Sequence, residues 1–200
     1  MLVDLSIKDF AKRVASHEPV VPAGGCVMAL SGLMGICLLE MSVNSAYGRP
    51  EGEKYEGFFK NARTQFTVLH SELLTYVDRD AEAYGKMLAA YKLQKFTLKE
   101  AEQRRTEIQV AALSSIEIPL KISEACIVAM GLGTMVLPKV KHGVLGDLKI
   151  GLLVIKAAIE GSLATAKINL PLIREDTIVT ILQVRIDELQ AKFDTVMTGL

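Results

Sequence analysis

The chain has 200 residues, of which 50% are hydrophobic, and its 23 Lys and Arg residues balance its 23 Asp and Glu residues. This length and composition allow a single domain, residues 1–200, to bury a substantial core without disulfides or a metal. The zero net charge gives no electrostatic argument for a nucleic acid or an anionic membrane as partner, so a small ligand is the better expectation.

Helical periodicity dominates the whole chain, and no Asn-Gly or Asp-Gly turn joins two alternating segments. We therefore predict an all-α fold, built as an antiparallel bundle of several helices. The sequence places these helices at residues 5–16, 25–47, 52–93, 98–136, 147–170 and 173–197. Proline inside a helix removes a hydrogen bond, so we expect an interruption of the fourth helix at Pro119.

One apolar stretch is long enough to raise the question of a membrane. Residues 19–39 carry no charge, which by length alone is sufficient for a bilayer span. However, Pro22, Gly24 and Gly25 break its first part, and the remaining helical segment, CVMALSGLMGICLL, is too short. The residues upstream have the amphipathic spacing of a surface helix rather than of a signal peptide. We predict a buried helix of a soluble protein and no membrane partner.

Two predicted helices have faces of small residues at near-helical spacing. These residues are Gly25, Ala29, Gly32 and Gly35 in the first, and Ala157, Gly161, Thr165 and Asn169 in the second. Helices that are apolar on nearly every side must be covered on nearly every side, which one bundle of this size does poorly. We therefore expect a homodimer.

The cysteines give an indication of the cellular compartment. Cys26, Cys37 and Cys126 are odd in number, lie in apolar surroundings and show neither CxxC nor Cys/His ligand spacing. We expect a reduced, cytoplasmic protein without a metal site.

An acidic segment, DRDAEAYGKMLAAYKLQK at residues 78–95, contains the best candidate for chemistry. On a helix, Asp80 shares a face with Tyr84, whereas Asp78 and Glu82 point to the opposite side. We expect Asp80 to be half-buried, which raises a carboxyl pKa toward the range useful for proton transfer, and the other two acids to be solvated. Spacing alone leaves open that Asp80 only bonds a backbone group or a lysine.

Four stretches in order resemble a known family. They are VPAGGCVMALSGLMG at 21–35, YGR at 47–49, the acidic segment at 78–95, and GDLKIGLLVIKAAIEGSLATAKINL at 146–170. They are similar to the glycine-rich turn, the D-x-D-A-x-A-F/Y motif and the S-D helix of the cyclodeaminase domain of formiminotransferase-cyclodeaminases and their stand-alone relatives, including methenyltetrahydrofolate cyclohydrolases. The resemblance spans nearly the whole chain.

The resemblance implies a homodimeric helical bundle that acts on tetrahydrofolate derivatives without a metal, nucleotide or redox cofactor. It makes Asp80, the second aspartate of the D-x-D motif, the catalytic residue. Backbone groups of the glycine turn and the start of the helix near Asp147 are expected to meet polar edges of the pterin, and Lys95 the glutamate carboxylates. The expected substrate-binding residues are Gly24, Gly25, Cys26, Tyr84, Lys95 and Asp147.

The chain departs from the family pattern at three places: Ala23 and Cys26 in the family's Gly-Gly-Gly-Ser, Gln94 in its Leu-Pro-Lys, and Gly146 in its Ser-Asp. Loss of two hydroxyl groups removes hydrogen bonds typically worth about 0.5–1.5 kcal/mol each. Three functions therefore stay open: formiminotetrahydrofolate cyclodeaminase, methenyltetrahydrofolate cyclohydrolase, and a non-catalytic folate-binding helical dimer.

Overall fold

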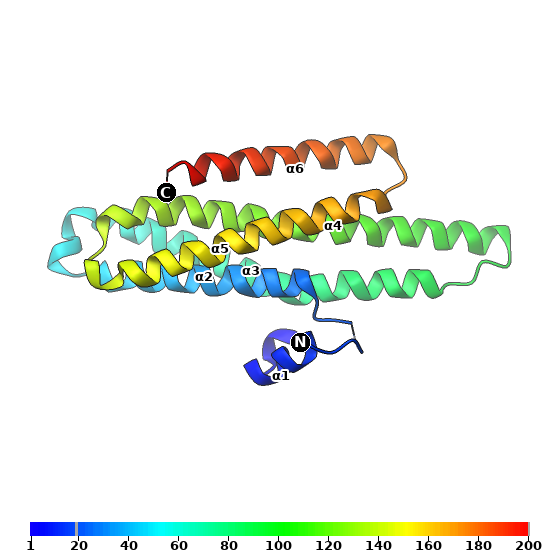
Figure 1. Ribbon diagram of the computed structural model, residues 1–200, viewed down its shortest axis with the longest axis horizontal. Coiled ribbons are helices and arrows are strands. Elements are labelled where there is room, and N and C mark those ends of the chain that lie inside the picture. Colours follow the sequence, from blue (N-terminus) through cyan, green and yellow to red (C-terminus); the bar gives the residue numbers. More distant parts are fainter. Residues whose placement is uncertain (19, 200) are drawn as a thin grey trace.

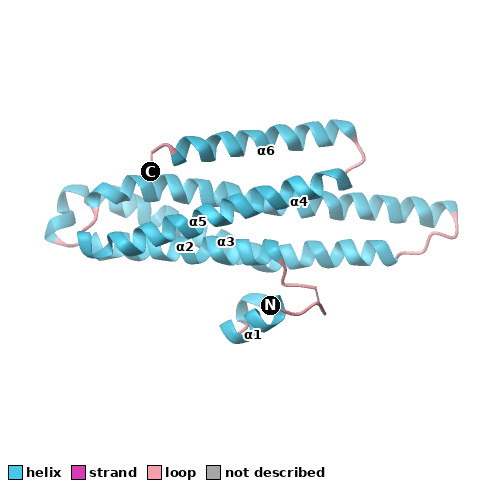
Figure 2. Cartoon of the chain, in the orientation of Figure 1, coloured by secondary structure: helices cyan, strands magenta, loops and turns pink. Residues whose placement is uncertain are grey.

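The computed structural model of the protein describes residues 1–18 and 20–199, and all regular structure in this part of the chain is helical (Figure 2). The α-helices are α1 (Ile7–Val14), α2 (Gly24–Ala46), α3 (Glu56–Lys92), α4 (Leu98–Val136), α5 (His142–Asn169) and α6 (Asp176–Met197). Short 3-10 helices cover Leu2–Asp4, Pro50–Tyr55, Leu137–Lys139 and Leu170–Leu172. Pro19, where the uncharged stretch begins, lies outside the described residues.

Four long helices form the body of the molecule. α2 packs against α3 and α5, and α4 packs against the same two helices, so that neighbours run antiparallel (Figure 1). α6 lies along α4 on one side of this group, and α1 lies apart from it on the other side (Figure 1). The prediction of an all-α antiparallel bundle is confirmed, while the homodimer stays a prediction.

The small residues of α2 and α5 allow the two backbones to approach closely. A Cβ atom added at Gly35 would lie 2.8 Å from the carbonyl oxygen of Gly151, and one added at Gly151 would lie 2.9 Å from the carbonyl oxygen of Gly35. Part of the small-residue surface that suggested a second copy is therefore used within one chain. The outer faces of these helices still expose apolar side chains: Met34 is 49% exposed and Leu153 65%.

Two helices, residues 24–46 and 98–139, are long and apolar enough to cross a membrane by length and composition. Both lie inside the bundle, and their most apolar windows are 50% and 56% buried there. α2 is therefore covered by protein on a large part of its surface, as the buried-helix interpretation expects.

Pro119 does not interrupt the fourth helix, because α4 continues from Leu98 to Val136 with this proline buried inside it. Proline has no N–H, so the carbonyl group of Ser115, four residues earlier, loses its helical donor. The side-chain amide of Asn169, the last residue of α5, donates to that carbonyl oxygen at 3.0 Å. The expected interruption is thus wrong because a neighbouring helix supplies the missing hydrogen bond.

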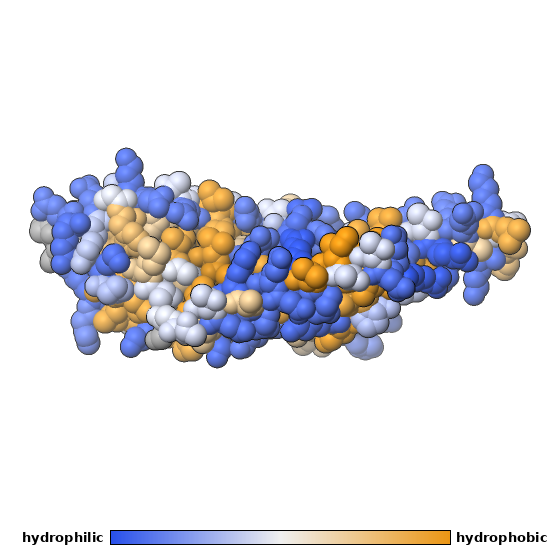
Figure 3. Space-filling view, turned by 90° about the horizontal axis from the view of Figure 1, so that it is seen from above, coloured by the Kyte–Doolittle hydropathy of each residue, from blue (hydrophilic) through white to orange (hydrophobic). Residues whose placement is uncertain are grey.

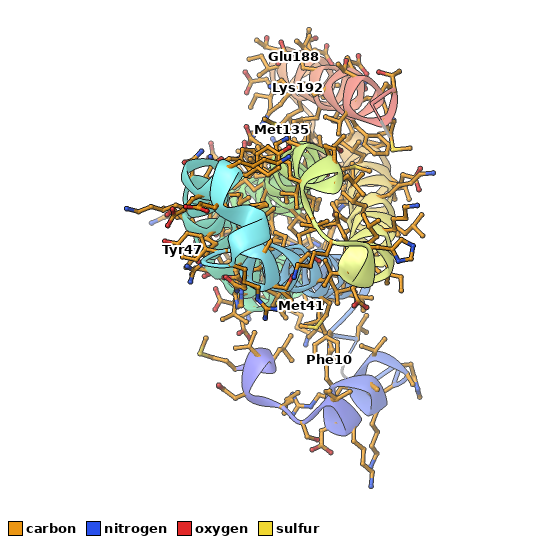
Figure 4. All side chains as sticks on the ribbon, turned by 90° about the vertical axis from the view of Figure 1, so that its left-hand side faces the viewer. Phe10, Met41, Tyr47, Met135, Glu188 and Lys192 are labelled. Atoms are coloured by element: carbon orange, nitrogen blue, oxygen red, sulfur yellow. The ribbon has the colours of Figure 1, made fainter. Side chains whose placement is uncertain are left out.

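The N-terminal segment folds back onto the bundle. The side chain of Phe10 lies between α1 and the long helices (Figure 4), where it packs against the core. A cavity of about 280 Å³ separates the segment from α2 and α3, and its lining is apolar, with Phe10, Leu30 and Leu74 among the residues. This contact brings the start of the chain close to the acidic segment of α3.

Candidate functional site

The carboxyl group of Asp80, on α3, meets the first turn of α2. The thiol of Cys26 donates a hydrogen bond to Oδ2 of Asp80 at 3.2 Å, and the backbone amide of Cys26 bonds to the same carboxyl group. The first amides of a helix have no partner within it, and the N-cap residue Ala23 offers no side-chain acceptor. Asp80 therefore caps α2 from a different helix.

Glycine at position 25 makes this contact sterically possible. A Cβ atom added at Gly25 would overlap the carboxyl group of Asp80, whereas one added at Gly24 would meet no atom within 4 Å. Gly25 is buried and Gly24 is exposed, so the two glycines of the turn have different roles. Only Gly25 provides the space that lets the carboxyl group reach the helix backbone.

The surroundings of Asp80 suit a group that exchanges a proton. Burial raises the pKa of Asp80, and the hydrogen bonds from the thiol and amide of Cys26 partly oppose this effect. Burial and, next, the negative charge of Asp80 raise the pKa of Cys26 to about 12, so the thiol stays protonated. Cys26 is therefore a neutral hydrogen-bond donor and not a nucleophile, and Asp80 is the titrating group.

Asp78 does not have the solvated position that the helical face predicts. It is partly buried, and one of its oxygens accepts a hydrogen bond from the backbone amide of Leu2. Its other oxygen, Oδ2, is buried and has no partner among the described residues. The prediction was wrong because the N-terminal segment covers this side of α3. Glu82 is exposed, as expected.

The other predicted site residues fall into two groups. Tyr84 is partly buried one helical turn after Asp80. Lys95 is exposed in the turn after α3, and α3 alone rises about 18 Å between Asp80 and its last residue, Lys92. Within one chain the structure therefore joins Gly25, Cys26 and Asp80, with Tyr84 one turn further along α3, but it does not bring Lys95 to them.

Asp147 is also distant from Asp80. Asp80 contacts the first turn of α2, and Met28 lies close to that turn. A Cβ atom added at Gly161 would meet the side chain of Met28, so Gly161 marks the part of α5 that lies beside the start of α2. The helix rises about 21 Å between Asp147 and Gly161. Asp147 is exposed and lies in the second turn of α5, which begins at His142, so the expectation that this helix starts near Asp147 is wrong.

Comparison with known proteins identifies the family of the chain. Residues 6–188 match the family described as formiminotransferase-cyclodeaminase. The chain belongs to this family. Its glycine turn and its D-x-D motif meet in this structure, where Gly25 and Cys26 contact Asp80. Asp80 is the second aspartate of the motif.

Several members of the formiminotransferase-cyclodeaminase family are similar to the chain over different lengths. The formimidoyltransferase-cyclodeaminase of Rattus norvegicus is 29% identical over 123 residues, which are 62% of this chain but only 23% of the rat protein. The methenyltetrahydrofolate cyclohydrolase of Methylorubrum extorquens is 27% identical over 164 residues, covering 82% of this chain and 78% of that protein.

The crystal structure of the formiminotetrahydrofolate cyclodeaminase of Thermotoga maritima has a TM-score of 0.88 to this family member. The match covers 100% of this chain and 95% of that chain at 20% sequence identity, which establishes a shared fold.

A second polar cluster of this family member, around His70 of α3, is not indicated by the sequence. Nδ1 of His70 lies 3.4 Å from Oε2 of Glu40 and 3.9 Å from the sulfur of Cys37, and Thr67 donates to the same carboxylate at 3.2 Å. Cys37 and Glu40 are three residues apart on α2, which is a helical-face signal, but nothing local indicates that His70 of α3 joins them. Among the described residues no group of three or more His, Cys, Asp or Glu is placed to hold a metal, and the expected absence of a metal stays a prediction.

Proposed function

We propose that the protein cyclises 5-formiminotetrahydrofolate to 5,10-methenyltetrahydrofolate with release of ammonia, and that Asp80 carries the proton. The observation that carries this proposal is the carboxyl group of Asp80, which is held at the glycine turn of α2 with a raised pKa. Membership of the formiminotransferase-cyclodeaminase family supports it, as do relatives named for the same folate chemistry.

The reaction requires a proton to move between two nitrogens. N10 of the substrate attacks the carbon of the protonated formimino group, so a C–N10 bond forms and the C=NH2⁺ double bond becomes a C–NH2 single bond. The carboxylate of Asp80 accepts the proton from N10 and returns it to the former imino nitrogen, which leaves as ammonia when its bond to carbon breaks. Such proton transfer typically contributes a factor of about 10²–10⁴ in rate. Burial keeps the pKa of Asp80 above its ordinary value, which makes both steps feasible for one group.

Cys26 positions this carboxyl group. Its thiol occupies one side of Oδ2 of Asp80, and its backbone amide adds a second donor. Because two donors from the same residue hold the carboxyl group, the direction in which Asp80 faces the substrate is set by the start of α2. The serine of the family pattern is replaced here by a weaker hydrogen-bond donor, which leaves the carboxylate more basic.

We also propose that a second copy of the chain completes the site. Lys95 and Asp147 lie far from Asp80 within one chain, so they can contribute to a shared pocket only from a partner. The outer faces of α2 and α5 expose apolar side chains such as Met34, Ile150 and Leu153, which suits burial against another copy. A single species with the mass of one chain in light scattering at micromolar concentration would contradict this arrangement.

A methenyltetrahydrofolate cyclohydrolase is the second candidate function. It is favoured by the relative from Methylorubrum extorquens, because that protein is matched over most of its own length, whereas the rat protein is matched over about a quarter. In this reaction water adds to the methenyl carbon, and Asp80 would take the proton from the attacking water. Asp80 would thus serve either reaction, and the two reactions differ in whether ammonia is released or water is added.

The experiment offers each substrate separately to the purified protein. The absorbance of methenyltetrahydrofolate is followed: it should rise with the 5-formimino compound if the protein is a cyclodeaminase, and fall with the methenyl compound if it is a cyclohydrolase. Asp80→Asn should reduce the observed rate about 10²–10⁴-fold. Asp78→Asn is the matched control and should retain activity, because Asp78 holds the N-terminal segment instead. Full activity of Asp80→Asn would refute the proposed role.

A further inference from the structure

A basic hollow lies at the end of the bundle where α3 turns into α4. Its volume is about 190 Å³, and it is lined by Lys95, Ala101, Arg104, Arg105, Ile108, Gln109 and Arg174. Four of these seven side chains are cationic and none is acidic. The two acids that follow Arg174, Glu175 and Asp176, do not line it. The surface at this tapering end is mainly hydrophilic (Figure 3).

The four cations lack the partners that other cations of the protein have. Arg185, for example, lies 3.5 Å from Glu117 and 3.4 Å from Glu124. In the described part of the chain none of the four cations of the hollow forms an ion pair. Among the described residues, Arg104 hydrogen-bonds to the carbonyl oxygen of Tyr91, at 3.2 Å, and its buried Nε has no partner. Unpaired cations that converge on one hollow favour an anion there.

The hollow is also held in shape before any ligand binds. The side chain of Gln109 on α4 donates to the carbonyl oxygen of Leu172 at 3.0 Å and accepts from the backbone amide of Arg174 at 2.8 Å. These two bonds attach the α5–α6 connection to α4 and so present Arg174 beside Arg105. The guanidinium of Arg104 stacks at 5.8 Å over the ring of Tyr91. The backbone at Arg174 and the side chain of Arg104 are therefore held in place before a ligand binds, which reduces the conformational entropy lost on binding.

We propose that this hollow binds a phosphate-bearing small molecule. Three of the four cations are arginines, whose planar guanidinium groups match phosphate oxygens with two parallel hydrogen bonds. The small volume suits one or two linked phosphate groups, which place several negative charges close together, better than an extended chain of separate carboxylates. Free diphosphate and the diphosphate of a nucleotide share this chemistry. Because α3 rises about 18 Å between Asp80 and the turn that carries Lys95, the hollow is separate from the carboxyl group of Asp80 in the same chain, and its three arginines take no part in the proposed reaction.

The test is calorimetric titration of the full chain with inorganic diphosphate at 0.15 M salt, with ADP and a tri-γ-glutamate peptide as parallel probes. Saturable binding of diphosphate or ADP is expected. Arg105→Ala and Arg174→Ala should each weaken it at least about tenfold, since a hydrogen bond to a charged group is among the stronger ones. Lys99→Ala is the matched control, because Lys99 is an exposed cation of the same helix that does not line the hollow, and it should bind as the unaltered protein does.

Equal binding of diphosphate and ADP would assign the phosphate groups as the recognised part, and tighter binding of ADP alone would assign a nucleotide as the source. No saturable binding of either probe, or equal losses in all three variants, would overturn the proposal. Binding of the glutamate peptide alone would overturn the phosphate assignment. Circular dichroism of each variant shows that the fold is retained.

Discussion

The contact between Gly25 and Asp80 leads to the sharpest prediction, for the substitution Gly25→Ala. The added methyl group would overlap the carboxyl group of Asp80, so either this side chain rotates away or the first turn of α2 shifts. In both cases the hydrogen bonds between Cys26 and Asp80 are lost. We expect a less stable protein with a displaced carboxyl group.

The size of this effect follows from three contributions. Inserting a methyl group into a packed site typically costs about 1–3 kcal/mol. Losing the hydrogen bonds to the Asp80 carboxyl group adds about 0.5–1.5 kcal/mol. Replacing glycine by alanine in a helix returns up to about 1 kcal/mol through backbone entropy. The net loss is about 0.5–4.5 kcal/mol in the free energy of unfolding, or roughly 1–18 °C in Tm for a chain of this size.

Chemical denaturation of matched glycine variants measures this difference. Gly24→Ala changes the neighbouring residue of the same turn, and Gly85→Ala changes an exposed glycine within α3; neither added Cβ atom meets anything within 4 Å. Both should be neutral or slightly stabilising. If Gly25→Ala were as stable as Gly24→Ala, the carboxyl group of Asp80 would not press on this backbone, and the description of the site would be wrong.

Three further predictions concern pH, thiols and the proline of α4. The folded chain holds the proton of Asp80 to higher pH than the unfolded chain, so the contribution of Asp80 to stability should fall as pH rises from the ordinary carboxyl pKa of 3.8 through the raised value. A pH series of unfolding curves should show a smaller fall for Asp80→Asn, and identical curves would contradict this. An alkylating reagent at neutral pH should modify Cys37 before Cys26, because Cys26 is fully buried and its pKa is raised to about 12. Peptide mapping that finds Cys26 modified first would refute this order. Asn169→Leu should cost about 1–3 kcal/mol in urea unfolding by leaving the carbonyl of Ser115 unsatisfied, and an unchanged midpoint would count against that role.

The sequence was sufficient to predict the helices and the special position of Asp80. Helical periodicity and proline positions locate long helices well, and the helical face that separates Asp80 from its neighbours follows from local geometry alone. The continuity of α4 through Pro119 could not be predicted in this way. It depends on Asn169, a residue of another helix, and no local pattern reveals which distant side chain faces a given carbonyl group.

The errors at the site have the same origin. Asp78 looked solvated because the helical wheel contains no information about a segment that folds back from the N-terminus. Lys95 and Asp147 were grouped with Asp80 through the resemblance, but the lengths of α3 and α5 place them far away within one chain. The partners of His70 were missed because they lie on α2, about thirty positions earlier in the chain. In each case the deciding contact joins residues that are remote in sequence.

The two aspartates of the D-x-D motif hold two different parts of the chain on the same helix. Asp78 binds the amide of Leu2, and Asp80 binds Cys26, so the segment between Leu2 and Cys26 is tethered at both ends, at positions two residues apart on α3. A ligand that engages the carboxyl group of Asp80 shares this group with Cys26 and so weakens one of these tethers. Occupancy of the site should therefore be felt in the N-terminal segment, where faster amide exchange on ligand binding would report it.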